Sequence, residues 1–419
     1  MLEMANDISN GSNISNGSKM TELGPLPEDW DVVKLEEIAE VKYGKAKPKE
    51  TGNIPVVGSG GIYALTSQAL VDFPSLVVGR KGTAGRVWLL ESPFWPSDTT
   101  FYLAWKDSSV DYRFVYYCFQ VNTLSGEHAK TTLPSLQKRD LENYVLPFPP
   151  LSEQRAIAYV LSTIQRAIEA TERVIAATRE LKKSLMHYLF TYGPVPLEEA
   201  ERVPLKETEI GTIPEHWEVV RLGKVFEFSR KPRSLDINKC HQIPFISMEY
   251  IPDEEVYLSK YDLKVREEIK SGTFFFNGDL LIAKITPSFE NGKQCIVKNL
   301  PTDFGYATTE VWPIHGTNEA EILCLFYYLK KDDIRADIAS KMEGSTGRQR
   351  VPKNVLENLM IPYPPLSEQR EIARILQSVD RKIETEKKRQ KALKALFKTM
   401  LDLLMTGKVR VKDLEVASQ

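Results

Sequence analysis

Two pairs of nearly identical segments, in the same order, divide the 419-residue chain into two similar halves. The first pair begins at Pro27 (PEDWDVVKL) and Pro214 (PEHWEVVRL). The second begins at Pro149 (PPLSEQRAIA) and Pro364 (PPLSEQREIA), where nine of ten positions agree. The offset is 187 residues for the first pair and 215 for the second, so the second half is 28 residues longer between the same landmarks. This arrangement indicates a tandem repeat, and a chain of this length needs at least two hydrophobic cores.

A long helix is predicted after each PPLSEQR segment, over residues 151–193 and 366–407. Apolar residues recur there in alternating steps of four and three, with a polar middle, which is the pattern of a coiled-coil seam. Ser152 is a candidate N-cap, and Gly193 and Gly407 are stop signals. Each helix of about 40 residues would be about 60 Å long. Because each module joins the N-terminal end of its own helix, an antiparallel pair is the simplest assembly.

The first helix carries a second apolar stripe beside the seam. Its members are Val160, Ala167, Val174, Leu181 and Tyr188. Two interpretations are equally open: the stripe packs on the globular modules, or it is a docking face for another subunit.

The segments between the landmarks have the pattern of mixed strands and turns. Residues 76–78, 86–90, 279–283 and 294–297 are β-like runs separated by Gly and Pro, while residues 111–121 and 319–331 have helical character. The predicted fold class is therefore α+β. Two mixed α/β modules, residues 21–150 (module 1) and 213–365 (module 2), are joined by two long helices that form an antiparallel coiled coil, in a pseudo-twofold tandem repeat.

The remaining segments are short. Residues 1–20 are rich in Asn, Ser and Gly and are expected to be a disordered tail. Residues 194–212 are expected to be a linker, and residues 408–419 a C-terminal tail. No apolar run approaches the roughly 20 residues of a membrane helix, and no secretory signal is evident, so the cytoplasm is the expected location.

Sequence motifs for catalysis are few. The chain has no G-x-x-x-x-G-K-[ST] phosphate loop and no GxGxxG fingerprint. A nuclease-like pattern can be placed on Asp253, Asp262 and Lys264, but such a short pattern is common. The four cysteines have no metal-ligand spacing and are expected to be buried thiols without a metal site. The absence of catalytic motifs favours recognition or scaffolding.

Several segments, in order, resemble the DNA-specificity subunit of Type I restriction–modification systems. They are residues 209–217 (EIGTIPEHW), both PPLSEQR helix starts, residues 58–62 (GSGGI), 78–85 (VGRKGTAG) and 94–100 (FWPSDTT) in module 1, and residues 278–293 (GDLLIAKITPSFENGK) and 308–311 (TTEV) in module 2. The resemblance covers nearly the whole chain after residue 20.

The resemblance implies a subunit that is non-catalytic by itself. Each module would be a target-recognition domain that reads one half of a bipartite site in double-stranded DNA. The helices would set the spacing between half-sites and dock two methyltransferase subunits, with translocase–nuclease restriction subunits as further possible partners. The chain itself would hold no cofactor, since S-adenosylmethionine, ATP and Mg would be used by the partner subunits.

The net charge is −2 for the whole chain, −2 for residues 26–150 and −2 for residues 213–365, so DNA binding must rely on clustered cations. Lys, Arg and neighbouring polar residues in predicted loops are candidate DNA contacts, because such groups bind phosphates and base edges. They are Lys45, Lys47, Arg80, Lys81, Thr83, Arg86, Lys130, Thr131 and Lys138 in module 1, and Arg230, Lys231, Arg233, Lys284, Ser288, Asn291, Lys293, Arg348, Gln349, Arg350 and Lys353 in module 2.

Two of the candidate segments align with each other across the repeat. Residues 130–138 align with residues 345–353, and both are expected to be polar loops just before the strand that leads to Pro-Pro. The alternative to DNA reading is a coiled-coil scaffold without sequence readout, and the presence of these cationic loops in both modules argues against it.

Overall fold

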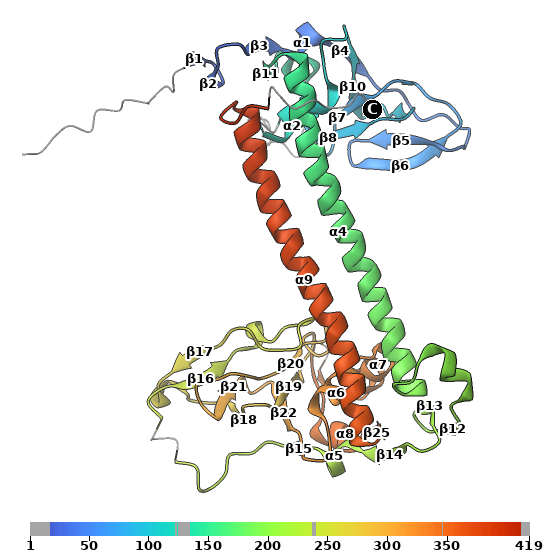
Figure 1. Ribbon diagram of the computed structural model, residues 1–419, viewed down its shortest axis with the longest axis vertical. Helices are drawn as coiled ribbons and strands as arrows, with labels where there is room; N and C mark the ends of the chain where they lie inside the picture. Colours follow the sequence, from blue (N-terminus) through green and yellow to red (C-terminus); the bar gives the residue numbers. More distant parts are fainter. Residues whose placement is uncertain (1–16, 122–123, 125–134, 237–239, 346, 412–419) are drawn as a thin grey trace, which may run out of the picture. The chain divides into compact units, whose positions relative to one another are not determined.

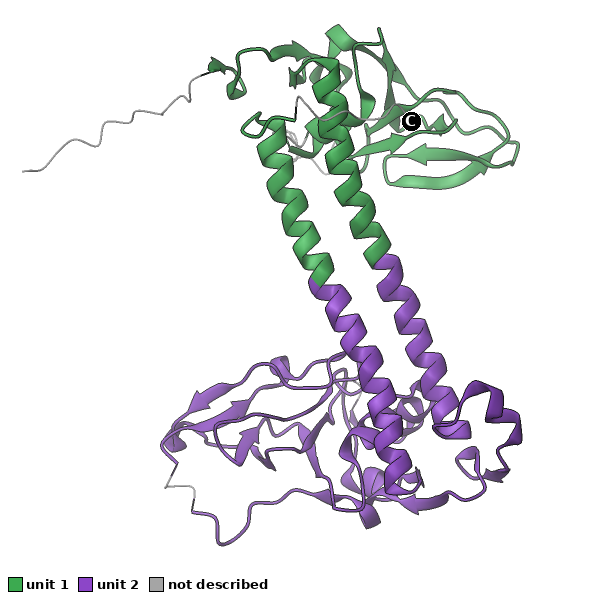
Figure 2. Ribbon diagram, in the orientation of Figure 1, with its two compact units in different colours: residues 1–171, 389–419 green, residues 172–388 purple. Residues whose placement is uncertain are grey.

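The computed structural model describes residues 17–121, 124, 135–236, 240–345 and 347–411. These residues form two compact units (Figure 2): unit 1 contains residues up to 171 and from 389, and unit 2 contains residues 172–388. The two long helices, α4 (Leu151–Tyr192) and α9 (Leu366–Met405), therefore each contribute one part to each unit. Unit 1 holds the start of α4 and the end of α9, and unit 2 holds the start of α9 and the end of α4.

Unit 1 is built mainly from short strands (Figure 1). Before α4 its elements are β1 (Ser18–Thr21), β2 (Gly24–Pro27), β3 (Asp31–Lys34), α1 (Leu35–Ile38), β4 (Ala39–Tyr43), β5 (Ile54–Gly58), β6 (Gly61–Thr66), β7 (Ser75–Gly79), β8 (Val87–Leu90), β9 (Trp95–Pro96), β10 (Thr100–Trp105), α2 (Tyr112–Val121), α3 (Lys138–Glu142) and β11 (Val145–Phe148). The central sheet has the order β4-β10-β7-β8, and a smaller sheet has the order β6-β5-β9.

Unit 2 contains, after α4, the elements η1 (Leu197–Arg202), β12 (Leu205–Thr208), β13 (Gly211–Pro214), β14 (Glu218–Arg221), α5 (Leu222–Val225), β15 (Glu227–Phe228), β16 (Ile243–Ile246), η3 (Met248–Tyr250), β17 (Asp262–Lys264), η4 (Arg266–Glu268), β18 (Thr273–Phe276), β19 (Leu280–Ala283), β20 (Gln294–Ile296), β21 (Phe304–Ala307), β22 (Val311–His315), α6 (Ile322–Tyr328), α7 (Asp332–Ser340), β23 (Glu343–Ser345), β24 (Arg348–Arg350), α8 (Lys353–Glu357) and β25 (Met360–Tyr363). Its sheet β15-β22-β19-β20 has the same strand order as the central sheet of unit 1.

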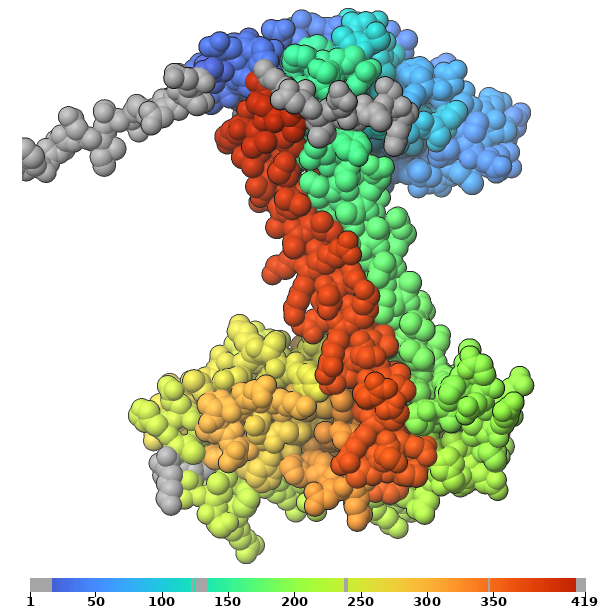
Figure 3. All heavy atoms as spheres, viewed as in Figure 1, coloured from blue at the N-terminus to red at the C-terminus, as the bar shows by residue number. Residues whose placement is uncertain are grey.

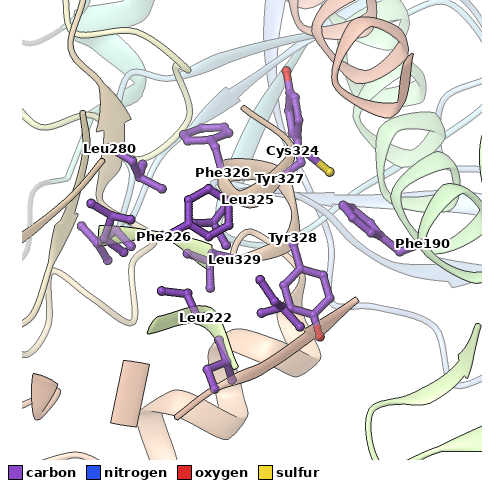
Figure 4. Packing of buried hydrophobic residues seen from close by; sticks show 14 of the residues in the cluster. Phe190, Leu222, Phe226, Leu280, Cys324, Leu325, Phe326, Tyr327, Tyr328 and Leu329 are labelled. Carbon is purple, nitrogen blue, oxygen red and sulfur yellow. The ribbon is translucent and has the colours of Figure 1, made fainter. Parts of the chain in front are cut away.

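The extra length of module 2 lies largely between β15 and β19. Three strands of this region, β16, β17 and β18, join β21, which follows β20, in a sheet of order β17-β16-β21-β18. This sheet stands in place of the three-stranded β6-β5-β9 sheet of unit 1. The core of unit 2 combines apolar residues of α6, such as Phe326, with Phe190 at the end of α4 (Figure 4). In unit 1 the corresponding core combines α2 with Leu161 of α4 and Leu404 of α9. Each module thus packs on parts of both long helices.

The strands expected from the β-like runs are confirmed as β7, β8, β19 and β20, and the helical segments as α2 and α6. Three of the four cysteines are buried as expected, whereas Cys240 is only partly buried. Ser152 is not an N-cap, because helix α4 already begins at Leu151 and the Pro150 carbonyl accepts the first helical hydrogen bonds. The expected linker at residues 194–212 contains η1 and β12.

One expectation about the chain ends needs correction. Residues 18–20 were expected in a disordered tail, but they belong to β1, which forms an antiparallel hairpin with β2. In the predicted C-terminal tail, which starts at residue 408, Arg410 binds Glu153 and Asp29. Residues 1–16 and 412–419 lie outside the described residues.

The PPLSEQR segment ties each module to its helix through the same two side chains. The indole N–H of Trp30 donates to Glu153 at 2.9 Å, and that of Trp217 donates to Glu368 at 2.8 Å. The amide oxygen of the next residue, Gln154, accepts the backbone N–H of Asp111 at 2.9 Å. Gln369 likewise accepts the N–H of Glu321 at 2.8 Å. The two Trp–Glu bonds connect the repeated segments within each half, which accounts for the recurrence of these segments together.

Each of these tryptophans also meets the end of the other long helix. Gly407, which follows α9, has a positive φ of 65° and packs against Pro27 and Trp30. Gly193, which follows α4, has a φ of 82° and packs against Trp217 and Glu368. The two stop signals are therefore confirmed, and each closes a helix against the module that begins the opposite helix.

The contacts of the two glycines predict unequal costs for alanine. A β-carbon at residue 407 would lie 2.3 Å from Cγ of Pro27, whereas at residue 193 its nearest neighbours would lie 3.4 Å away. Both changes strain a left-handed backbone by about 1 kcal/mol, and the clash adds about 1–3 kcal/mol at residue 407 only. In chemical denaturation we expect Gly407→Ala to be clearly more destabilising than its control Gly193→Ala. Equal losses would contradict this packing.

The Glu153 carboxylate predicts a pH dependence of unit 1. Burial by itself raises the pKa of Glu153, but hydrogen bonds from Arg410 and Trp30 outweigh burial and hold the pKa below its usual range. The lowered pKa stabilises the fold above the unfolded pKa of about 4.3, and this contribution is lost as pH falls through the folded pKa.

Arg410→Ala should therefore destabilise unit 1 by about 2 kcal/mol near neutral pH, because it leaves a buried carboxylate poorly compensated. The difference from the unmodified protein should shrink below about pH 4, where the carboxyl becomes protonated. Denaturation curves at several pH values test this, with Lys408→Ala as the control because its ion pair with Asp402 is exposed. A loss that is constant with pH would contradict the role of the ion pair.

Candidate functional site

The cationic candidates Arg80 and Lys284 occupy equivalent places in the two units. Arg80 follows the last residue of β7, and its backbone N–H donates to the carbonyl oxygen of Thr99 at 2.9 Å. Lys284 follows the last residue of β19, and its backbone N–H donates to the carbonyl oxygen of Glu310 at 3.0 Å. Each side chain therefore emerges at the same end of the same central strand of its sheet.

The segments that precede α3 and α8 pass beside these two cations. The carbonyl of Arg80 accepts the N–H of Leu136 at 2.9 Å, and that of Lys284 accepts the N–H of Val351 at 2.7 Å. Leu136 and Val351 are corresponding positions in the sequence alignment of residues 130–138 with residues 345–353. The hydrogen bonds thus match that alignment over its described part.

Aromatic rings of the neighbouring strand support both cations. The Arg80 guanidinium lies 5.9 Å from the centre of the Phe101 ring and 5.3 Å from that of Tyr43. The Lys284 ammonium lies 4.0 Å from the centre of the Trp312 ring. Phe101 pairs with Val78 of β7 and Trp312 with Ile282 of β19, which are equivalent registers. These rings limit the positions that each cation can take.

The two units differ at the residues around these cations. In unit 2 the Arg350 guanidinium makes two hydrogen bonds to the Glu310 carboxylate, Nε to Oε2 at 2.9 Å and Nη2 to Oε1 at 2.7 Å. These bonds lower the pKa of Glu310. Burial, with a contribution from nearby Arg350, lowers the pKa of Lys284. The equivalent positions in unit 1 are Thr99 and Ser135, which are neutral.

Residues 345–353 are not the polar loop expected from the sequence. Strands β23 and β24 form an antiparallel hairpin, and α8 begins at Lys353. Arg348 and Arg350 alternate with Gln349 along β24, so the two arginines share one face of the hairpin and Gln349 faces the other way. Arg348 and Arg350 can therefore contact one ligand together, whereas Gln349 lies on the opposite face of the strand.

The other module 1 candidates lie mainly at the surface. Lys45, Lys47, Lys81 and Thr83 are exposed. The Arg86 guanidinium lies 4.2 Å from the centre of the Trp88 ring, and Lys138 is paired with Glu142 at 3.2 Å. Lys130 and Thr131 lie outside the described residues. Arg80, Lys81 and Thr83 occupy one loop, whereas Lys45 precedes β5 and forms a bridge to Ser97.

Several module 2 candidates lie on the turn between β19 and β20. Ser288 and Asn291 are in this turn, and Lys293 donates its ammonium to the Met248 carbonyl at 2.9 Å. The buried Arg335, which sequence reasoning missed, holds the turn by donating to the carbonyl of Phe289 at 2.9 Å. Exposed candidates are Arg230, Lys231 and Arg233, which follow β15. Lys353 forms an ion pair with Glu357 and lies 4.5 Å from the Phe228 ring centre.

A cleft of about 860 Å³ lies within unit 2, between both long helices and the loop at residues 253–259. Its charged walls are largely paired. Glu254 binds Arg179 at 2.8 Å and also Lys387, and Lys182 binds Asp380 at 2.6 Å. Space-filling atoms of α4 and α9 meet in this part of the molecule (Figure 3). These contacts join module 2 to both helices and give the cleft walls of mixed charge.

The residues of the nuclease-like pattern have separate neighbours. Asp253 lines the cleft, and its carbonyl accepts the Lys330 ammonium at 2.7 Å. Asp262, on β17, accepts the hydroxyl of Tyr250 at 3.0 Å, and Lys264 lies over the Phe245 ring.

None of the helices in the described part of the chain combines the length and the apolar character that a membrane span requires.

Comparison with known proteins gives one consistent family. The model of the Type I restriction modification DNA specificity domain matches residues 27–178 and again residues 214–395. The MjaVIII specificity subunit of Methanocaldococcus jannaschii, a Type I restriction enzyme subunit, is 28% identical over 93% of this chain and 95% of its own length. The resemblance inferred from the sequence is thus confirmed.

Solved structures agree at the level of the fold. The S subunit of a Type I restriction–modification system from M. genitalium has a TM-score of 0.60 and 18% identity, over 95% of this chain and 98% of that one. A chain from a structure of complex assembly and conformational transition in the type I R-M system has a TM-score of 0.51 and 17% identity, over 92% of this chain and 99% of that one.

Proposed function

The chain belongs to the Type I restriction–modification DNA-specificity family, and from this membership we propose how its parts divide the work. Module 1 reads one half of a bipartite site in double-stranded DNA, and module 2 reads the other. The observation that carries this assignment is the pair of equivalent cations, Arg80 and Lys284, each at the end of a central strand and each over an aromatic ring.

The residues around the two cations differ, which supports the recognition of a different half-site by each module. Cationic and polar groups bind phosphates and base edges, and sequence preference depends on which groups reach the bases. Arg80 has neutral neighbours at Thr99 and Ser135, whereas Lys284 has Glu310 and Arg350. Two modules with the same sheet and different side chains at this place suit two different half-sites.

We propose that α4 and α9 form an antiparallel coiled coil that fixes the gap between half-sites. Several of the seam residues expected from the heptad pattern are buried within their units, among them Ile168 and Ile175 in α4 and Ile372 and Ile383 in α9. Half-sites read from one side of DNA are separated by about one helical turn, roughly 34 Å. Helices of 42 and 40 residues are long enough to fix such a gap.

The helices also suit the docking of two methyltransferase subunits. In the second apolar stripe of α4, the side chains of Val174 and Leu181 are 40% and 53% exposed, which favours a docking face at these two positions. Val160 and Tyr188, at its ends, pack partly against the module cores. In this proposal the chain is non-catalytic, and partner subunits, including any translocase–nuclease subunits, use S-adenosylmethionine, ATP and Mg.

Single substitutions at the two equivalent cations test the division of labour. In a complex with methyltransferase subunits, Arg80→Ala should weaken discrimination at one half-site, and Lys284→Ala at the other, by roughly tenfold each. The measurement is methylation of a DNA library randomised at each half-site in turn. Each variant is the matched control for the other.

Two results would decide against the proposal. If both substitutions weakened the same half-site, or both half-sites equally, the two-reader arrangement would be wrong. If the unmodified complex methylated unrelated duplexes equally, the chain would act as a scaffold without sequence readout.

A further inference from the structure

The ion pair between Glu310 and Arg350 holds a guanidinium in one orientation at the reading end of module 2. Both nitrogens on one side of Arg350, Nε and Nη2, donate to the two oxygens of Glu310. A bidentate pair of this kind fixes the plane of the guanidinium as well as its distance. The Arg350 side chain therefore has a defined direction before any ligand arrives.

The backbone below this side chain is also anchored. Arg350 forms a β-bridge with Ile285, and the carbonyl of its neighbour Gln349 accepts the N–H of Thr286 at 3.0 Å. On the other side, the carbonyl of Val351 accepts the indole N–H of Trp312 at 2.9 Å. The hairpin is thus attached to the segment after β19 on one side of Arg350 and to β22 on the other, and a guanidinium on such a support loses little freedom on binding.

The pair leaves the outer edge of the guanidinium available. Arginine has five N–H donors, and Glu310 takes two of them. Two of the others, one on Nη1 and one on Nη2, point in parallel from the end of the group. The Arg350 side chain is 49% exposed, and among the described residues none accepts a hydrogen bond from Nη1. The end of the group is therefore a rigid, accessible pair of donors.

A guanine base presents the matching partner. In the major groove its N7 and O6 are two adjacent acceptors, whereas adenine presents one acceptor and one donor. A parallel pair of donors fits the first pattern and meets a donor in the second. The chemistry of the site therefore selects guanine from the four bases.

A purely structural role for the pair is disfavoured. Unit 1 has the same sheet order and the same backbone hydrogen bonds with Thr99 and Ser135 in these places, so the fold forms without an ion pair there. Exposed ion pairs also contribute little to stability. An acidic residue at a surface that binds DNA repels phosphate. The presence of Glu310 there is explained if its role is to orient an arginine.

We propose that Arg350 reads a guanine in the half-site of module 2 and that Glu310 is the positioning residue that sets its orientation. This inference rests on the proposed function of module 2 as a DNA reader. Arg348, on the same face of β24, is placed to contact the DNA backbone beside that base.

The test uses the full chain in complex with its methyltransferase subunits and a DNA library randomised over both half-sites. Glu310→Gln keeps the size of the side chain and removes its charge. We expect discrimination in favour of guanine at one position of one half-site to fall by roughly tenfold. Affinity for random DNA should stay the same or increase, because a negative charge is removed. Arg350→Lys, which keeps the charge without the two parallel donors, should give the same loss of guanine preference.

Arg348→Ala is the matched control on the same strand. It should lower affinity for all sequences and leave the guanine preference intact. The melting temperature of each variant complex separates loss of reading from loss of folding, and Arg350→Lys keeps the test decisive if Glu310→Gln does not fold.

The outcomes are distinct. An unchanged guanine preference in Arg350→Lys overturns the inference while the proposed function stands. A gain in affinity in Glu310→Gln without any loss of guanine preference overturns the positioning role of Glu310. An unmodified complex without sequence preference at either half-site would instead overturn the proposed function itself.

Discussion

The hydrogen bond from a module tryptophan to the glutamate at the start of a long helix is the contact on which the rest of the architecture depends. Trp30 and Glu153 form it in unit 1, and Trp217 and Glu368 form it in unit 2. Both tryptophans are fully buried. The same tryptophan packs on the glycine that ends the other helix, Gly407 or Gly193. One side chain thus joins three segments that are distant in sequence: the start of a module, the start of its own helix and the end of the opposite one.

The glutamate carboxylate has different partners in the two copies of this junction. Glu153 has 1% side-chain exposure and is paired with Arg410, which also binds Asp29. Glu368 is 26% exposed and is paired with His216, whose ring nitrogen lies 2.8 Å from the carboxylate. A deeply buried carboxylate needs a permanent cation, whereas a partly hydrated one tolerates a weaker partner. Residues beyond the end of α9 therefore belong structurally to module 1, although about 380 positions separate Arg410 from Asp29.

The repeat, both long helices and the main strands could be predicted from the sequence because each depends on a local pattern. Heptad spacing, glycine stop signals and the Trp and Glu-Gln landmarks are visible within short windows. The residues that surround Lys284, at the proposed DNA-reading site of module 2, could not be predicted in this way. Glu310 and Arg350 are 40 positions apart, and nothing in their immediate neighbours indicates that they pair. The hairpin of β23 and β24 was also missed, because its residues are exposed and lack the apolar alternation by which strands are recognised.

The physical reason for this difference lies in what each part has to do. Junction residues such as Trp30 and Gln154 are buried, so their chemistry is dictated by packing and is the same in both copies. Side chains around Arg80 and Lys284 are partly or fully exposed, and the fold accommodates threonine and serine in one unit and glutamate and arginine in the other. Under the proposed function, DNA recognition rather than packing would determine which residues stand at these places. The shared backbone hydrogen bonds keep Arg80 and Lys284 at equivalent places in the two units, while the residues around these two cations differ.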